Sequence, residues 1–253
     1  MTLFLGSGGS ILALFLAMLL SLELGRRIGV RRRCEDPAGA DKGTGAIESA
    51  VFGLMGLLVA FTFGGALGRF DHRRDLILEE TNAIGTAWLR LDLVPAENRA
   101  ALRADLRRYV DLRLADTHAA ATTASAEVTA QQQKIWAQVA AVARNAADNR
   151  IATVLLPAVN AMFDLAGTRY LAVQSHPPGS VYALLLVLAL LCSLLAGYGL
   201  AGGKRRSWLH ILSFTGSLLM AIYVIVDTEF PRQGLIRVDR FDQLLVDLRD
   251  AMK

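Results

Sequence analysis
The sequence predicts an all-α membrane protein with four transmembrane helices. The first observation is composition, because 53% of the 253 residues are hydrophobic and only 20% are charged, which is too apolar for a soluble domain of this size. The second is the presence of four apolar stretches that few charges interrupt. The third is a helical periodicity in the polar sequence between and after these stretches.

Four stretches are long and apolar enough to cross a bilayer, whose core of about 30 Å requires about 20 apolar residues in a helix. They cover residues 3–24, 46–68, 180–201 and 207–228. The first has no basic segment ahead of it and no small-residue cleavage site, so we interpret it as a retained span and not as a signal peptide. The predicted organisation is 1–68 for spans one and two, 69–179 for a helical extramembrane insert, 180–228 for spans three and four, and 229–253 for an amphipathic C-terminal tail.

The insert is predicted to be helical, because its apolar residues recur at steps of three and four and no strand pattern competes. No Gly or Pro occurs between Arg69 and Ile84, so span two is expected to continue into the insert as one helix. That helix should end at about Leu93, before Pro95. Further helices are predicted at 96–116 and 131–174, the latter kinked at Pro157, with a turn between them at 117–125.

The tail resumes helical periodicity after Pro231 and Gly234. The apolar face of the predicted tail helix consists of Leu235, Val238, Phe241, Leu245, Leu248 and Met252. This face lies either on the insert or on the membrane surface.

Positive charge in the two short loops predicts the orientation in the membrane. The basic loop residues are Arg26, Arg27, Arg31, Arg32, Arg33 and Lys42 in the first loop and Lys204, Arg205 and Arg206 in the second. Such clusters mark the cytoplasmic side, so the insert and the C-terminus are expected outside the cytoplasm. The preference for arginine over lysine favours a bacterial source, and hence the bacterial inner membrane.

Signatures of an enzyme are absent from the sequence. The histidines His72, His118, His176 and His210 lack the spacing of a zinc site, and the contexts of Cys34 and Cys192 disfavour a disulfide. The glycines at 197, 199 and 202 match the letters of a dinucleotide fingerprint, but they end an apolar span, where they permit close packing and a tight turn. We therefore expect no catalytic residue, no metal, no cofactor and no nucleic-acid partner.

Span two carries a stripe of small residues on one helical face, called here the small-residue stripe. It consists of Gly53, Gly56, Ala60, Gly64 and Gly68. Small residues let helices approach closely, within one protomer or between protomers. Alternatively, the stripe lines a pore whose narrowest part is set by Phe61 and Phe63.

Glu48 and Thr62 lie on a different face of span two. Glu48 is expected at the cytoplasmic end, where a carboxylate either reaches toward the membrane surface or belongs to an ion pathway.

Span four carries a polar seam with a regular three-four spacing. It consists of His210, Ser213, Ser217, Met220, Val224 and Asp227. The seam either forms hydrogen bonds between helices or faces water. Asp227 and Glu229, at the end of the span, would form acidic rings in an oligomer and concentrate cations, or would pair with Arg232 or Arg237 and anchor the tail.

Several sequence blocks resemble the bestrophin-like bacterial membrane proteins of unknown function. The blocks are ESAVFGLMGLLVAFTFGGA at 48–66, RFDHRR at 69–74, EETNAIGTAWLR at 79–90, LLPAVN at 155–160 and DTEFPRQGLIRVD at 227–239. Similarity to true bestrophins is more distant. Those are pentameric ion channels with four spans per protomer and a pore lined by span two, and the resemblance implies a similar assembly here.

The sequence departs from true bestrophins in two respects. Gly64, Gly65 and Gly68 stand where a bulky aromatic neck is expected. The loop charges also place the insert outside the cytoplasm, whereas bestrophins keep theirs inside.

The resulting hypothesis is an oligomeric ion channel that conducts cations, with span two, and span four as a second candidate, lining the pathway. Its expected partners are further copies of itself, with a pentamer as the bestrophin precedent, the lipid bilayer and inorganic ions. The alternative is a membrane-anchored interaction or sensor protein whose insert binds a partner in the cell envelope.

Overall fold

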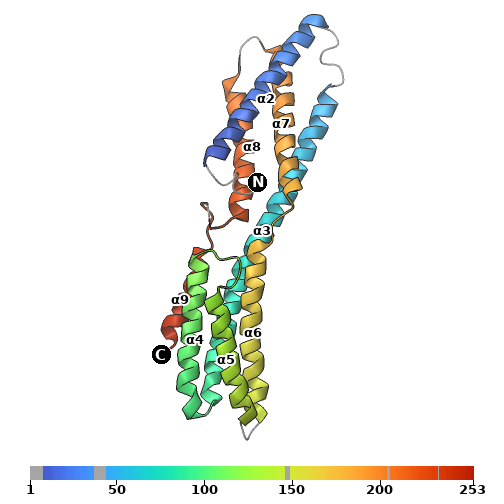
Figure 1. Cartoon of the computed structure of the whole chain (residues 1–253). Helices are drawn as coiled ribbons and strands as arrows, with labels where there is room; N and C mark the ends of the chain where they lie inside the picture. Colours follow the sequence, from blue (N-terminus) through green and yellow to red (C-terminus); the bar gives the residue numbers. More distant parts are fainter. Residues whose placement is uncertain (1–7, 37–43, 146–148, 204–205, 233) are drawn as a thin grey trace. The chain divides into compact units, whose positions relative to one another are not determined.

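The computed structural model describes residues 8–36, 44–145, 149–203, 206–232 and 234–253. Every regular element within these ranges is a helix, so the all-α prediction is confirmed (Figure 1). The helices are α2 (Gly8–Glu35), α3 (Thr44–Arg90), η1 (Leu91–Leu93), α4 (Ala96–His118), α5 (Ala126–Asn145), α6 (Asn149–Gln174), α7 (Gly179–Gly199), η2 (Leu200–Gly202), α8 (Trp208–Glu229) and α9 (Asp239–Ala251). Lys42, Lys204 and Arg205, three of the charges behind the predicted orientation, lie outside the described residues.

Three helical segments in the described part of the chain are long and apolar enough to cross a membrane. They are Gly45–Leu93, Ile151–Gly202 and Trp208–Glu229, and they contain the predicted spans two, three and four. The four-span arrangement is not confirmed, because α2 is not among these segments and residues 3–7 of predicted span one lie outside the described ranges.

The insert differs from its predicted helices in one place. The helix continuing from span two and the helix at 96–116 match α3 and α4 closely. The prediction of a single helix at 131–174 is wrong, because two helices, α5 and α6, occupy this region. Pro157 lies inside α6 and does not end it. The sequence signal that would have found the division is Asn145, Asp148 and Asn149, whose side chains favour helix ends and turns.

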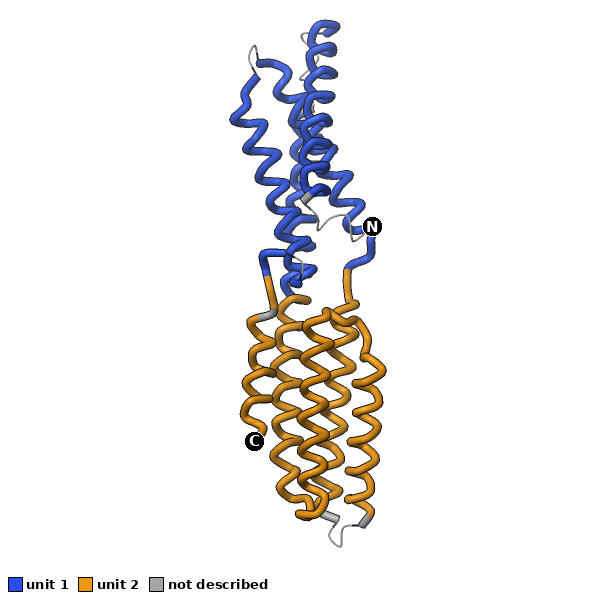
Figure 2. The backbone as a smooth tube through the Cα atoms, turned by 60° about the vertical axis from the view of Figure 1, so that its left-hand side comes forward, with its two compact units in different colours: residues 1–68, 177–236 blue, residues 69–176, 237–253 orange. Residues whose placement is uncertain are grey.

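The chain divides into two compact units (Figure 2). Unit 1 contains residues 1–68 and 177–236, and unit 2 contains residues 69–176 and 237–253. Helix α3 contributes to both units. The tail helix α9 belongs to the same unit as the insert helices α4, α5 and α6.

In unit 1, α2 and α7 pack with their backbones in contact. A Cβ atom on Gly25 would lie 1.8 Å from the carbonyl oxygen of Leu194, and one on Gly197 would lie 1.9 Å from that of Leu22. The hydroxyl of Ser21 adds a hydrogen bond of 2.7 Å to the carbonyl oxygen of Leu190. Only glycine fits at such a distance, so the close packing expected at Gly197 is confirmed.

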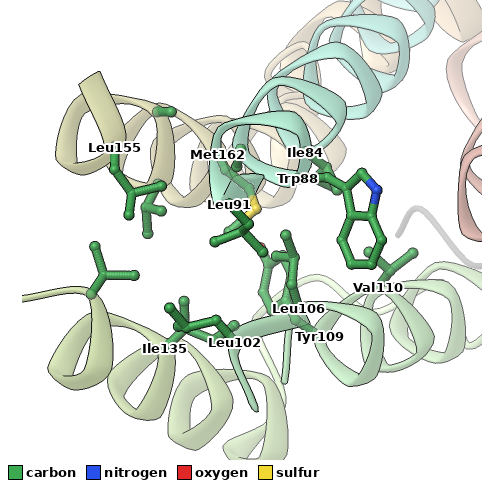
Figure 3. Packing of buried hydrophobic residues seen from close by; sticks show 14 of the residues in the cluster. Ile84, Trp88, Leu91, Leu102, Leu106, Tyr109, Val110, Ile135, Leu155 and Met162 are labelled. Carbon is green, nitrogen blue, oxygen red and sulfur yellow. The ribbon is translucent and has the colours of Figure 1, made fainter. Parts of the chain in front are cut away.

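In unit 2, the second part of α3 packs with α4, α5 and α6 around one apolar core (Figure 3). Each helix contributes residues at helical spacing. Core residues include Ile84, Trp88 and Leu91 from the end of α3 and from η1, Leu102, Leu106 and Tyr109 from α4, Ile135 from α5, and Leu155 and Met162 from α6. Both ends of α6 are held by arginines of α3, because Arg73 donates to the carbonyl oxygens of Ala172 and Ser175 and Arg90 donates to that of Val154.

The tail helix α9 docks on the insert. Leu245 and Met252 are buried in the core of unit 2. Arg249 forms two hydrogen bonds, of 2.5 and 3.0 Å, with the carboxylate of Asp111 on α4. The sequence left open whether the tail helix lies on the insert or on the membrane surface, and in the structure it lies on the insert.

Replacing Gly197 with alanine should destabilise the protein by more than about 2 kcal/mol, because the new Cβ would overlap the backbone of α2. The matched control is Gly216→Ala in α8, where an added Cβ would meet nothing within 4 Å. Alanine is a better helix former than glycine, so the control should be neutral or stabilising by up to about 1 kcal/mol. Thermal unfolding in detergent measures the change in stability that each substitution causes. Equal effects of the two substitutions would contradict the close contact.

Candidate functional site
The glycines of the small-residue stripe on α3 have open space beside them. Cβ atoms added at Gly53, Gly56, Gly64 or Gly68 would have nothing within 4 Å. Ala60 is likewise exposed. Close helix packing on this stripe within one protomer is therefore not observed among the described residues, and packing between protomers stays a prediction.

The aromatic and polar candidates of span two differ in exposure. Phe61 is 70% exposed and Phe63 is 39% exposed. The hydroxyl of Thr62 donates to the carbonyl oxygens of Leu58 and Val59 in its own helix. Glu48 is half-buried, and its carboxylate lies beside Gly199 at the end of α7, 3.8 Å from where a Cβ of that glycine would be. Glu48 is therefore a carboxylate that α7 partly covers.

The polar seam of α8 also faces outward for most of its length. His210, Ser213, Ser217 and Met220 are exposed, Val224 is half-buried and Asp227 is buried. The hydroxyl of Ser217 donates to the carbonyl oxygen of Phe214 in the same helix, and His210 Nδ1 lies 2.6 Å from Ser207 Oγ. These two contacts lie within α8 and the residue that precedes it, and they do not join α8 to another helix.

A groove of about 530 Å³ in unit 1 is lined by one residue of the stripe and one residue of the seam. Gly56 of the stripe and Ser217 of the seam both line it. The complete lining is Phe52, Met55, Gly56, Val59, Cys192, Phe214, Ser217, Leu218 and Ala221, from α3, α7 and α8. The rings of Phe52 and Phe214 meet edge to face, with centroids 6.0 Å apart. Apart from the Ser217 hydroxyl and the Cys192 thiol, the lining is apolar.

Asp227 fastens the chain that follows α8. Its two carboxylate oxygens accept hydrogen bonds of 2.9 Å from the backbone N–H groups of Leu235 and Ile236. A Cβ on Gly234 would lie 1.3 Å from Asp227 Oδ1, so any other residue here would displace the carboxylate from its hydrogen bonds. The sequence offered Arg232 or Arg237 as partners through which Asp227 would anchor the tail, and this pairing stays a prediction. The hydrogen bonds in the structure join Asp227 to the backbone of the segment that follows α8. Glu229 is only 1% exposed in the single chain.

Unit 2 contains a buried charge cluster centred on Glu80, which is 0% exposed. Arg113 Nε lies 2.6 Å from Glu80 Oε1, and Arg169 forms a second ion pair with the same carboxylate. Arg113 also donates to the hydroxyl of Tyr170, which in turn donates to Asp116. Four helices of this unit are joined by the cluster, since Arg169 also pairs with Asp242 of α9 at 3.6 Å.

The charges in this cluster are mutually compensating. Burial opposes ionisation of Glu80, but Arg169 and Arg113 outweigh it and hold the pKa of Glu80 below its ordinary value. Burial and the hydrogen bond to Asp116 raise the pKa of Tyr170. The side chains of this cluster thus keep their charges at neutral pH, and their ion pairs hold the helices of unit 2 together. No group of His, Cys, Asp and Glu suitable for a metal ion occurs among the residues that the structure describes.

A comparison with family models decides the family. A model of the bestrophin-like domain matches residues 12–241, which include all three apolar segments and the insert. The chain belongs to the bestrophin-like family. Searches of curated proteins and of solved structures find no match for this bestrophin-like chain. Membership is compatible with a membrane ion channel, and the apolar helices support a membrane protein.

Sequence reasoning placed the candidate residues on the correct helices but missed two features. The groove depends on how α3, α7 and α8 pack, which no local pattern specifies. The Glu80 cluster joins residues up to 162 positions apart, from Glu80 to Asp242 (242 − 80 = 162). The one sequence signal for this cluster is the position of Glu80, which shares the apolar face of α3 with Ile77 and Ile84 and is therefore expected to be buried.

Glu80→Gln should destabilise the protein by about 3–5 kcal/mol, because it leaves two buried arginines without their carboxylate. The adjacent residue Glu79 is exposed and provides the control. Glu79→Gln should change the free energy of unfolding by no more than about 0.5 kcal/mol. Folding lowers the pKa of Glu80, so its stabilisation is present above the unfolded-state pKa and is lost as the pH falls through the folded-state value. Between pH 7 and pH 3, the free energy of unfolding should decrease less in Glu80→Gln than in the wild type. Parallel losses would refute this assignment.

Gly234→Ala should destabilise the connection between α8 and α9 by about 2 kcal/mol or more, because its Cβ would overlap the Asp227 carboxylate. The effect should shrink strongly in an Asp227→Ala background, where the obstacle is absent. A double-mutant cycle of unfolding midpoints measures this coupling. Additive effects would show that the two residues do not interact.

Proposed function
We propose that this bestrophin-like chain forms a homo-oligomeric channel that conducts cations across a bacterial inner membrane. The observation that carries the proposal is the open groove that Gly56 of the small-residue stripe and Ser217 of the polar seam both line, together with the exposure of most of the stripe and the seam. Family membership and the apolar helices support the membrane setting.

Exposure of the polar seam favours an oligomer over a monomer surrounded by lipid. Ser213 and Ser217 would otherwise place polar side chains against hydrocarbon, which is unfavourable even where a serine bonds to its own helix. A second copy covering these residues, or water in a central pathway, removes that cost. The glycines of α3 offer the second copy a surface on which helix backbones can approach closely.

Within this assembly, we propose that α3 lines the pathway and that α8 contributes its seam. Phe61 and Phe63 are the aromatic side chains that would narrow the pathway, since both are exposed in the single chain. Cation preference is assigned to Glu48, which is more exposed than Asp227 and Glu229. A ring of such carboxylates would raise the local cation concentration.

The proposed orientation places unit 2 outside the cytoplasm. The support is the arginine cluster in the last part of α2, where Arg27 and Arg31 are exposed near the end of the apolar sequence. Clusters of this kind remain on the cytoplasmic side during insertion.

Reconstituted full-length protein should carry a cation current across liposomes, and Glu48→Gln should reduce the cation-to-anion permeability ratio by about threefold or more. Glu97→Gln, which removes an exposed carboxylate of unit 2, is the control and should leave the ratio unchanged. Absence of any ion flux from the wild type would favour the alternative, an anchored interaction protein whose helical insert binds a partner.

Cysteine labelling in intact cells tests the orientation. Ala120→Cys places a thiol at an exposed position of unit 2, while the native exposed Cys34 reports on the opposite side. A membrane-impermeant reagent should label position 120 in intact cells and Cys34 only after permeabilisation. The reverse pattern would establish the orientation of true bestrophins.

A further inference from the structure
Glu23 gathers three arginines at one end of unit 1. Its carboxylate lies 3.1 Å from Arg26 Nε, 3.0 Å from Arg27 Nε and 3.1 Å from Arg206 Nη2. Arg26 and Arg27 belong to α2, whereas Arg206 precedes α8, so a single carboxylate joins two separate elements. Three guanidinium groups against one carboxylate leave an excess of two positive charges.

The outer face of α2 changes from apolar to basic at this level. Leu20 is 71% exposed and Leu24 is 52% exposed. At helical spacing they are followed by Arg27 and Arg31, whose side chains are 74% and 86% exposed. The same face thus offers a surface for hydrocarbon and, directly beyond it, guanidinium groups that can bind an anion in two-pronged fashion.

The start of α8 carries the side chains typical of a membrane boundary. Trp208 and Leu209 are 55% and 75% exposed, and only Ser207 separates them from Arg206. Tryptophan is enriched at the level of lipid headgroups. The basic cluster therefore lies where an apolar helix surface ends, beside an exposed tryptophan.

We propose that Arg26, Arg27, Arg31 and Arg206 form a binding surface for the phosphate of anionic phospholipids, with the acyl chains along Leu20 and Leu24. Charge complementarity selects the headgroup, because the four arginines face only two carboxylates, that of Glu23 and that of Glu35, which lies 4.0 Å from Arg31 Nε. The exposed leucines on the same face select a lipid over a soluble anion. The role of Glu23 is to position the arginines, which would otherwise repel one another. This inference requires unit 1 to lie in a membrane, but it does not depend on ion conduction.

Native mass spectrometry of the full-length protein, titrated with phosphatidylglycerol or phosphatidylcholine, tests the proposal. The wild type should bind phosphatidylglycerol more tightly than phosphatidylcholine. Because each arginine near a membrane surface is worth a factor of about five, Arg27→Gln/Arg31→Gln should weaken phosphatidylglycerol binding about 25-fold. Arg27→Lys/Arg31→Lys keeps the positive charge, and its affinity for phosphatidylglycerol should fall by about fivefold or less.

The control pair is Arg108→Gln/Arg144→Gln, which removes two exposed charges from unit 2 and should leave lipid binding unchanged. Equal affinity of the wild type for both lipids would overturn the proposal, as would equal losses in the test and control pairs. Full displacement of phosphatidylglycerol by millimolar inorganic phosphate would identify a soluble-anion site instead. If the glutamine pair fails to fold, the single Arg31→Gln variant, at the most exposed of these arginines, should still show a fivefold loss, and no loss there would refute the proposal.

Discussion
At Gly25 and Gly197 the backbones of α2 and α7 touch with no side chain between them, and the rest of unit 1 depends on this contact. The pairing occupies one side of α7. Another side of α7, at Cys192, takes part in the groove with α3 and α8. The glycines of α3 take no part in this contact, and Cβ atoms added to Gly53, Gly56, Gly64 or Gly68 would meet nothing within 4 Å, so this face remains available to a surface outside the chain. The outward faces of α3 and α8 are thus consistent with a protomer built for assembly.

Unit 2 is held together by a different kind of interaction. Its apolar core supplies most of the packing, but the Glu80 carboxylate fixes which helices meet, since both Arg113 and Arg169 must reach it. Buried ion pairs add little net stability compared with apolar packing, yet removal of one partner is costly. The cluster also includes Asp242 of α9, so the tail helix is tied to the insert by charge as well as by Leu245 and Met252.

Most elements could be predicted from the sequence, because apolar runs and helical periodicity are local signals. The continuation of span two to Leu93 followed from the absence of Gly and Pro and from Pro95. The division between α5 and α6 was missed, because alanine-rich sequence continued the helical pattern there. The partners of Asp227 and Glu80 could not be predicted, because packing brings them near. They are the amides after Gly234 for Asp227, and Arg113 and Arg169 for Glu80. Gly234 itself was visible as a helix breaker, but its contact with a carboxylate was not.

The central claim is that the open faces of α3 and α8 are covered by further copies of the chain. The most direct test is the mass of the full-length protein extracted in a lipid-preserving detergent, measured for the wild type and for Gly64→Leu. The account predicts a single closed oligomer for the wild type and its dissociation by Gly64→Leu, because leucine would separate the helix backbones that glycine lets approach. A monomeric wild type, or a Gly64→Leu variant that assembles normally, would contradict it.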